Sequence, residues 1–339
     1  MIRTLLQRFE PRSRSIAPPP SEPLPEMVYV NLGQTGLQVS VAGLGSGGHS
    51  RLGLSTGNGQ ANAISVVQQA VDWGVNLIDT AEAYGSEAII GQAIRSFPRD
   101  RLVLSTKKQP MDKKGQMISP KVLIRSLERS LKALKTDYID IYHLHGLKPK
   151  QYNTVVPALL PTLERLKEQG KIRCIGVTES FTKDPTHQML TRALNDDCWD
   201  VMMVGFNCIN QTARPELLLK ATDKGIGVLG MFAVRNALCS SAKFKAAVET
   251  LQAEGVISKG PSASAIVASL LNHSDVASVP DLAYRYCRYQ PGIDVVMFGT
   301  GRFDHLHQNI ASLLRSPLPD ELTQSLERIF SPVTTFTGN

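Results

Sequence analysis

The stretch YIDIYHLHGLKPKQYNTVVPALLPTLERLKEQGKIRCIGVT, residues 138–178, decides the fold. It begins with an apolar β-rich run at 138–145, continues with an amphipathic helical pattern at 155–169 and ends with a second β-rich run at 172–178. Two mostly apolar strands joined by a helix predict a β-α-β unit, in which the strands are parallel and buried on both faces.

The same alternation continues on both sides of this unit. Eight β-rich runs occur after residue 28, at 39–45, 75–79, 101–107, 138–145, 172–178, 200–206, 225–232 and 294–300. Helical patterns lie between them at 63–73, 87–97, 122–134, 155–169, 187–194 and 215–224. Eight strand–helix units over about 260 residues predict an α/β fold, the (β/α)8 or TIM barrel.

A doubly wound open sheet is the main alternative to the barrel. A dinucleotide-binding open sheet usually carries a G-x-G-x-x-G turn between its first strand and helix, and this sequence lacks that turn. The segment 233–293, before the last strand, is longer than one helix needs. It predicts an extra loop and helices that could cover a site.

Residues 1–28 are interpreted as an N-terminal tail, disordered or extended, and residues 29–339 as a single barrel domain. The tail holds six of the 20 prolines, including three in a row at 18–20, which favours extended polyproline over packing. Its arginines leave an organelle-targeting segment as an alternative, against which Glu10 counts. Secretion is not expected, because no apolar segment precedes a small-residue cleavage site.

Composition limits the class of protein. Of the 339 residues, 42% are hydrophobic and 20% are charged, and no run of 18 apolar residues is present to span a bilayer. The 37 basic and 30 acidic residues give a net charge of +7, which favours a small anionic ligand over nucleic acid. The five cysteines form no C-x-x-C pair, which fits a cytoplasmic protein.

Polar side chains end three consecutive strands of the predicted barrel. Asp79 ends the second strand, Lys107 the third and His145 the fourth, and Tyr84 follows in the loop after the second. In barrels of this type the chemistry lies at the carboxyl ends of the strands. Because charged groups beyond inward apolar residues are costly unless paired or hydrated, we expect these side chains to meet at the rim.

Two neighbouring residues compete with these candidates. Lys108 competes with Lys107, although the two side chains point to opposite faces. His143 competes with His145 on the same face, and such an H-x-H pair could hold a metal ion in a barrel hydrolase. The other five histidines form no completing set. We expect no metal and retain metal-dependent hydrolysis as an alternative function.

Five segments carry a family resemblance: GVNLIDTAEAYG (74–85), LSTK (104–107), TDYIDIYHLH (136–145), GKIRCIGVT (170–178) and GTGRFDHLHQN (299–309). With them the chain resembles the aldo-keto reductases from about residue 29 to residue 330. The resemblance implies a barrel enzyme that uses a nicotinamide cofactor. It also implies a catalytic tetrad, which falls on Asp79, Tyr84, Lys107 and His145.

The chemistry expected of this tetrad follows from charge. A carbonyl that accepts hydride develops negative charge on oxygen, and Tyr84 is the expected proton donor. At about 4 Å and an effective dielectric of about 20, the ammonium of Lys107 could lower the phenol's pKa by up to about 3 before desolvation is subtracted. Asp79 is expected to hold the lysine, and His145 to position the substrate oxygen.

The resemblance places six residues at the nicotinamide end of a cofactor site: Thr178, Glu179, Met203, Asn207, Met231 and Phe232. Glu179 replaces a common asparagine and can still accept amide N–H groups. Met203 stands where a glutamine usually binds the carboxamide and cannot do so, and Asn207 is a candidate replacement. Met231 stands where an aromatic ring often stacks, with Phe232 next to it.

The closing motif resembles the family's phosphate-binding turn, in which backbone N–H groups and a helix dipole favour an anion. The expected contacts in it are Gly299, Thr300, Gly301, Arg302, His305 and Asn309. Arg302 favours NADP(H) over NAD(H), although His305 stands where many relatives have a second arginine. Arg235 is a further candidate, for the pyrophosphate.

The sequence therefore predicts an NADPH-dependent reductase of an aldehyde or ketone, able in reverse to oxidise a sugar-type alcohol. Its expected partner is a small carbonyl or alcohol substrate, with no nucleic acid or membrane partner, and a monomer is compatible with the pattern. The loops at 49–58, 109–120 and 147–154 are expected to set specificity. The alternative is an NADPH-binding regulatory or sensing subunit with little turnover.

Overall fold

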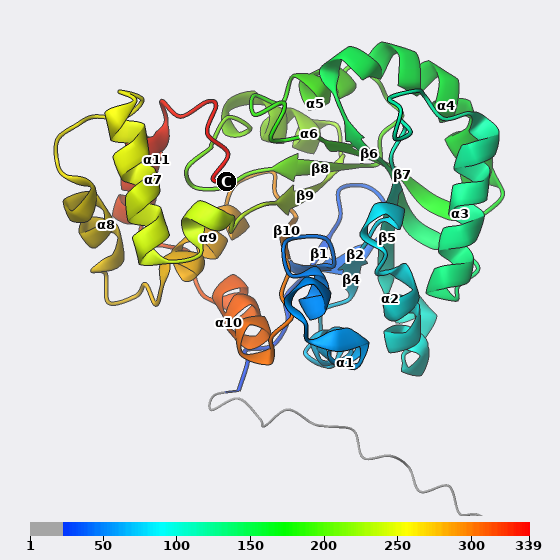
Figure 1. Ribbon diagram of the computed structural model, residues 1–339, viewed down its shortest axis with the longest axis horizontal. Coiled ribbons are helices and arrows are strands. Elements are labelled where there is room, and N and C mark those ends of the chain that lie inside the picture. The colour runs from blue at the N-terminus through cyan, green and yellow to red at the C-terminus, as the bar shows by residue number, and fades with distance from the viewer. Residues whose placement is uncertain (1–22) are drawn as a thin grey trace, which may run out of the picture.

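A closed barrel of eight parallel strands forms the centre of the computed structural model, which describes residues 23–339 (Figure 1). The strands are β3 (Ala42–Gly45), β4 (Leu77–Asp79), β5 (Val103–Lys108), β6 (Ile139–Leu147), β7 (Ile172–Glu179), β8 (Val201–Gly205), β9 (Gly227–Met231) and β10 (Val295–Phe298). Each pairs with the next in chain order, and β10 closes the barrel on β3. The predicted (β/α)8 barrel is confirmed.

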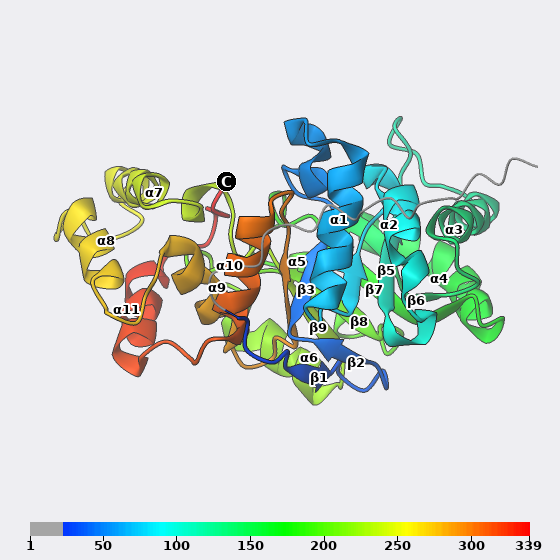
Figure 2. The same ribbon diagram turned by 90° about the horizontal axis from the view of Figure 1, so that it is seen from below.

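Helices lie around the outside of the strands and in a group to one side of the barrel (Figures 1 and 2). They are α1 (Gly59–Asp72), α2 (Glu87–Ala93), α3 (Pro120–Leu134), α4 (Tyr152–Glu168), α5 (Gln188–Ala193), α6 (Leu219–Asp223), α7 (Ser241–Ala253), α8 (Ala263–Leu271), α9 (Val279–Arg288), α10 (Phe303–Leu314) and α11 (Asp320–Phe330). The six predicted helical patterns correspond to α1–α6. Over residues 23–339, every helix is too short or too polar to cross a membrane.

Alternation along the strands separates two apolar layers. Side chains such as Leu77, Val103 and Ile141 point into the barrel and form one buried cluster. Their neighbours Ile78, Leu104 and Tyr142 belong to a second cluster, which packs under the helices. The period of two along each strand explains why these runs are apolar on both faces.

An antiparallel hairpin of β1 (Tyr29–Asn31) and β2 (Gln38–Ser40) closes the amino-terminal end of the barrel. Its side chains Leu32, Leu37 and Val39 are buried in the interior cluster. At Gly33 a Cβ atom would lie 2.4 Å from the Gly225 carbonyl oxygen, so the turn meets the foot of β9 closely. Figure 2 shows the hairpin at the lower end of the barrel, below the C-terminus.

The prediction of the first strand was wrong in its extent. The run 39–45 was expected to be one strand, whereas the chain bends at Val41 and divides it between β2 and β3. The bend is held by Ser40, whose hydroxyl donates to the Ala42 carbonyl and whose backbone N–H donates to Asn76 Oδ1. Most of the predicted tail lies outside the described residues.

The segment 233–293 contributes α7, α8 and α9, as its length predicts. Figures 1 and 2 show α7 and α8 beside α11, on the side of the barrel away from α3 and α4. Helix α9 packs against α10. This packing brings the insertion next to the carboxyl-terminal part of the chain, where the cavity described below opens.

Candidate active site

Strands β4 and β5 deliver a buried ion pair to the carboxyl end of the barrel. Lys107 Nζ lies 2.5 Å from Asp79 Oδ2 and 2.8 Å from the Thr80 carbonyl oxygen. The Lys107 side chain is 0% exposed. An ammonium taken out of water needs such partners, so removal of either charge leaves the other buried and uncompensated.

Tyr84 lies beside this pair on the short 3₁₀ helix Glu82–Tyr84, which ends at the left-handed Gly85. The ammonium nitrogen of Lys107 is 5.1 Å from the centre of the Tyr84 ring. The Tyr84 hydroxyl is 3.3 Å from His145 Nε2, and the two rings meet edge to face. At Gly47 a Cβ atom would lie 2.8 Å from the Tyr84 ring, so only glycine leaves the phenol in place.

The structure thus brings the four expected catalytic side chains together. The two competing residues lie elsewhere. Lys108 points outward and pairs with Glu82 at 2.5 Å. His143 points inward but is wholly buried below the rim, where its Nε2 lies 3.1 Å from Ser105 Oγ.

The electrostatics of the site favour the neutral forms of Tyr84 and His145. Burial raises the pKa of Tyr84, and this effect outweighs the ammonium of Lys107, which lowers it. The expected fall of the phenol's pKa is therefore reversed, because burial opposes the phenolate and Asp79 offsets part of the lysine's charge. Burial and Lys107 lower the pKa of His145 to about 3. Near neutral pH, Tyr84 keeps its proton and His145 is uncharged.

Glu82 anchors the turn that carries Tyr84. Its carboxylate accepts hydrogen bonds from Lys108 at 2.5 Å, Arg129 at 2.6 Å and Ser126 at 2.8 Å. Burial alone would raise the pKa of Glu82, but these bonds lower it to about 2. The turn is thereby tied to β5 and α3 by charge.

This anchor predicts a pH-dependent loss of stability. Because the folded-state pKa of Glu82 is lowered, its contribution is present above about pH 4.5 and is lost as pH falls toward about 2. We expect Glu82→Gln to reduce the free energy of unfolding at pH 7 by about 1–2 kcal/mol, after allowance for solvent screening. Urea unfolding at pH 7, 5 and 3 measures the difference in unfolding free energy between Glu82→Gln and wild type. This difference should become smaller as the pH falls. A difference that is the same at all three pH values would contradict the stabilising role of the Glu82 carboxylate.

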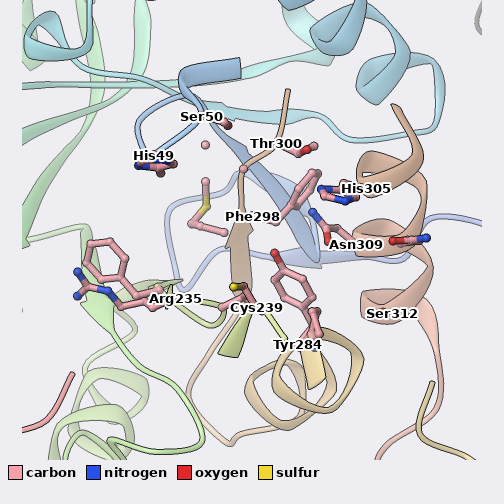
Figure 3. A pocket seen from close by; sticks show the side chains of 18 of the residues that line it. His49, Ser50, Arg235, Cys239, Tyr284, Phe298, Thr300, His305, Asn309 and Ser312 are labelled. Carbon is pink, nitrogen blue, oxygen red and sulfur yellow. The ribbon is translucent and has the colours of Figure 1, made fainter. Parts of the chain in front are cut away.

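A cavity of about 1840 Å³ opens beside Asp79 and Tyr84 and extends to α10. Ligand pockets commonly occupy about 300–1,000 Å³, so this one has room for a dinucleotide and a substrate. Figure 3 shows Thr300, His305 and Asn309 on one side of the cavity and His49 and Arg235 on the other. The expected residues that line it are Asp79, Tyr84, Met203, Met231, Phe232, Arg235, Gly299, Thr300, Gly301, Arg302, His305 and Asn309.

Three expected cofactor contacts are not brought into the cavity: Thr178, Glu179 and Asn207. Thr178 Oγ1 accepts the Gly146 N–H at 2.7 Å. Asn207 donates its side-chain N–H to the Thr337 carbonyl at 3.2 Å. These polar groups hold neighbouring backbone instead.

Glu179 has a structural partner that the expectation did not include. Both carboxylate oxygens lie 2.9 Å from His187 Nδ1, and one accepts the Gly205 N–H at 2.7 Å. The pair is wholly buried. Glu179 therefore ties the loop after β7 to the end of β8 rather than facing the cavity.

Apolar side chains line the part of the cavity at which the family resemblance implies a nicotinamide ring. Met203, Met231 and Met297 line the cavity there. Phe232, with a φ of 70°, turns away from the strand direction and stacks on Phe181 at 6.1 Å. The cavity floor is therefore thioether and ring surface.

Arg235 fits an anionic group in the cavity. Its guanidinium carbon lies 4.2 Å from the centre of the Phe232 ring, and its Nη1 is buried with no hydrogen-bond partner among residues 23–339. Burial lowers the pKa of Arg235. A buried guanidinium donor without an acceptor is suited to a phosphate oxygen, as in a dinucleotide's pyrophosphate.

The turn before α10 is tightly held at the other end of the cavity. The Gly301 carbonyl accepts side-chain N–H groups from Asn58 at 3.0 Å and Asn62 at 2.8 Å. A Cβ atom at Gly301 would lie 2.2 Å from Gly53, so this turn requires glycine. The loop after β3 therefore packs directly on the expected phosphate-binding turn.

Arg302 carries a partner of opposite charge. Its side chain is 62% exposed and pairs with Asp304 in the first turn of α10 at 2.6 Å. The expected 2′-phosphate contact therefore lies next to a carboxylate, which reduces the net positive charge there.

The insertion supplies cavity residues that the sequence analysis missed. Ser278, Asp281 and Tyr284, from the start of α9, line the cavity beside Asn309. The sequence does indicate a helix start here, because Ser278, which caps α9, is followed by Val-Pro-Asp, a pattern typical of a helix start. What the pattern does not indicate is which helix face meets the cavity.

The metal alternative is not supported by the arrangement of side chains. Within residues 23–339 no three histidine, cysteine, aspartate or glutamate side chains are grouped as metal ligands. His143 is bonded to Ser105 and His145 to Tyr84, so the two imidazoles face different partners.

Comparisons with known proteins agree with this geometry. A model of the Aldo/keto reductase family matches residues 43–330. L-galactose dehydrogenase from Arabidopsis thaliana is 28% identical over 315 residues, which cover 90% of this chain and 95% of that protein. NADH-specific methylglyoxal reductase from Escherichia coli is 30% identical over 221 residues, covering 60% and 66%. A solved thermostable aldo-keto reductase in complex with the inhibitor epalrestat superposes with a TM-score of 0.67 at 25% identity, covering 89% and 99%.

Proposed function

The chain belongs to the aldo/keto reductase family, and we propose that it reduces an aldehyde or ketone to an alcohol with NADPH. In reverse it would oxidise a sugar-type alcohol. The observation that carries the proposal is that Tyr84, which lines the cavity, has its hydroxyl 3.3 Å from His145 Nε2 and its ring centre 5.1 Å from the ammonium nitrogen of Lys107.

Each residue has a role in the reaction. Tyr84 OH and His145 Nε2 lie 3.3 Å apart, so one substrate oxygen can accept hydrogen bonds from both. Tyr84 gives its proton to that oxygen. The ammonium of Lys107 stabilises the phenolate left behind, and Asp79 keeps the ammonium in place. A bound dihydronicotinamide supplies the hydride.

Residues along the cavity would hold the cofactor. The backbone of the turn at 299–302 and the start of α10 suit a phosphate, and Arg235 suits the pyrophosphate. Met203 and Met231 offer apolar contact to the nicotinamide ring but no hydrogen bond to its carboxamide. This leaves the ring held by shape more than by polar contacts.

Turnover is the test of the proposed function. Purified protein should quench or enhance NADPH fluorescence on binding, and should consume NADPH with some member of a panel of small aldehydes, ketones and sugars. Tight NADPH binding without turnover on the whole panel, or on the matching alcohols with NADP⁺, would favour a sensing subunit instead. The observation that favours a sensing subunit is the methionine lining of the cavity, which offers no hydrogen bond to the carboxamide of the cofactor.

The Arg302–Asp304 pair predicts how cofactor preference can be changed. Asp304→Asn frees the guanidinium and removes a charge that repels a 2′-phosphate, so the NADPH/NADH affinity ratio should rise about three- to tenfold. Arg302→Ala should lower the ratio by a similar factor. Fluorescence titration with both cofactors measures it. An unchanged ratio in Arg302→Ala would refute the assignment of this arginine to the 2′-phosphate.

A further inference from the structure

His143 is a buried polar residue to which the proposed reaction assigns no role. It lies inside the barrel on β6, 0% exposed and outside the cavity lining. Its ring occupies the space opposite Gly176, where a Cβ atom would lie 2.2 Å from the imidazole Nδ1. A polar ring in an apolar interior is costly unless it is hydrogen-bonded, so its partner is informative.

The partner connects His143 to the ion pair. His143 Nε2 lies 3.1 Å from Ser105 Oγ, and Ser105 Oγ donates to Asp79 Oδ1 at 2.6 Å. The other oxygen of the same carboxylate binds Lys107 at 2.5 Å. His143, Ser105, Asp79 and Lys107 therefore form one continuous chain of hydrogen bonds across three strands.

The direction of each bond follows from the chemistry of the groups. The carboxylate of Asp79 can only accept, so the single hydroxyl proton of Ser105 is used toward it. Ser105 Oγ is then the acceptor for His143, whose Nε2 must carry a proton. His143 is thereby assigned as the neutral tautomer with hydrogen on Nε2.

The surroundings keep His143 neutral. Burial, Lys107 on β5 and His145 on the same strand lower the pKa of His143 well below its usual range, and together they outweigh the backbone of Val177 on β7, which raises it. Asp79 on β4 is reached only through Ser105. On β7 the titratable side chain in the interior cluster is Cys174, and burial raises the pKa of its thiol to about 12, so it stays neutral.

We propose that His143 and Ser105 are positioning residues that fix the Asp79 carboxylate for Lys107. The proposal rests on the proposed function, because it assigns these residues to the support of the proton donor Tyr84. With one oxygen held by Ser105, the carboxylate cannot rotate about its axis, and its charge is shared between two donors. Lys107 then keeps more of its attraction for the Tyr84 phenolate.

Loss of the supporting bonds should therefore appear in the pH profile. In Ser105→Ala the carboxylate directs its charge to Lys107 alone. In His143→Leu the Ser105 hydroxyl loses the donor that orients it toward Asp79, and its bond to the carboxylate weakens. In both variants the phenolate is stabilised less. We expect the pKa of the ascending, low-pH limb of kcat for alcohol oxidation, in which the Tyr84 phenolate is the base, to rise by about 0.5–1, and kcat for oxidation at pH 7 to fall about three- to tenfold. KM should stay within about twofold, since neither residue lines the cavity.

Two variants separate positioning from packing. His143→Gln retains an N–H donor near Nε2 and should restore most of kcat and the wild-type pH profile. Ile141→Val, a buried residue two positions earlier on the same strand, lies outside the hydrogen-bond chain and should leave the profile unchanged. If His143→Leu and Ser105→Ala keep the wild-type profile, or if His143→Gln behaves as His143→Leu does, the proposal is overturned.

A measurement independent of turnover tests the same chain of bonds. In the full-length protein, ¹⁵N imidazole spectra, with His143 identified by comparison with His143→Gln, should show a protonated Nε2 and an unprotonated Nδ1 from pH 5 to 9. Titration near pH 6.5, or a proton on Nδ1, would overturn the inference. Absence of turnover in wild type would instead refute the proposed function, so the two failures can be told apart.

Discussion

Replacing Tyr84 with phenylalanine is expected to lower kcat/KM for carbonyl reduction by about 10²–10⁴-fold, while the NADPH dissociation constant stays within about twofold. Tyr84→Phe removes the donated proton and one of the two hydrogen bonds to the developing oxyanion. It keeps the ring, which packs over Gly47 and against the edge of His145. The fold and the cavity wall should therefore be preserved.

Steady-state rates and fluorescence titration on the same preparation measure both quantities. Tyr142→Phe is the matched control, because Tyr142 is a buried tyrosine on β6 outside the cavity lining. Its rate should equal that of wild type. An unchanged rate in Tyr84→Phe across a broad carbonyl panel would end the assignment of Tyr84 as the proton donor.

Replacing Lys107 with methionine is expected to harm both activity and stability. The ammonium that stabilises the phenolate is lost, so we expect kcat to fall by about 10³-fold or more. The carboxylate of Asp79 is left buried beside Ser105 without its cation. Breaking a buried pair in this way costs about 3–5 kcal/mol of unfolding free energy.

Pairing this substitution with Asp79→Asn separates the two effects. The double variant buries no unpaired charge, so most of the lost stability should return while the activity stays low. Lys108→Met is the control at the adjacent position, since Lys108 pairs with Glu82 on the outside of the barrel. A larger loss of activity in Lys108→Met than in Lys107→Met would contradict the assignment of the lysines.

The barrel could be predicted because its signals are local. Each strand is an apolar run with a period of two, and each of the first six helices lies within an amphipathic run of the sequence. The candidate catalytic residues could also be placed, because Asp79, Lys107 and His145 lie at or near the carboxyl ends of consecutive strands, and parallel strands share a carboxyl edge. Strand order alone brings these side chains to the same place.

What could not be predicted depends on contacts distant in sequence. The run at 39–45 reads as one strand, and its bend is fixed by Asn76, more than thirty residues away. Glu179 reads as a cavity residue because nothing local indicates that His187, in a left-handed conformation, will pair with it. The raised pKa of Tyr84 depends on burial, which a sequence does not state.

The β1–β2 hairpin closes the amino-terminal end of the barrel, opposite the end at which the candidate catalytic residues lie. At the amino-terminal end, the buried side chains of Leu32 and Val39 complete the packing of the barrel interior. The candidate catalytic side chains lie at the carboxyl end. Loops at the carboxyl end, such as the one at 109–118 between β5 and α3, could therefore be replaced without disturbing the packing at the amino-terminal end. The same division leaves the rim free to diverge toward new reactants while the scaffold stays constant.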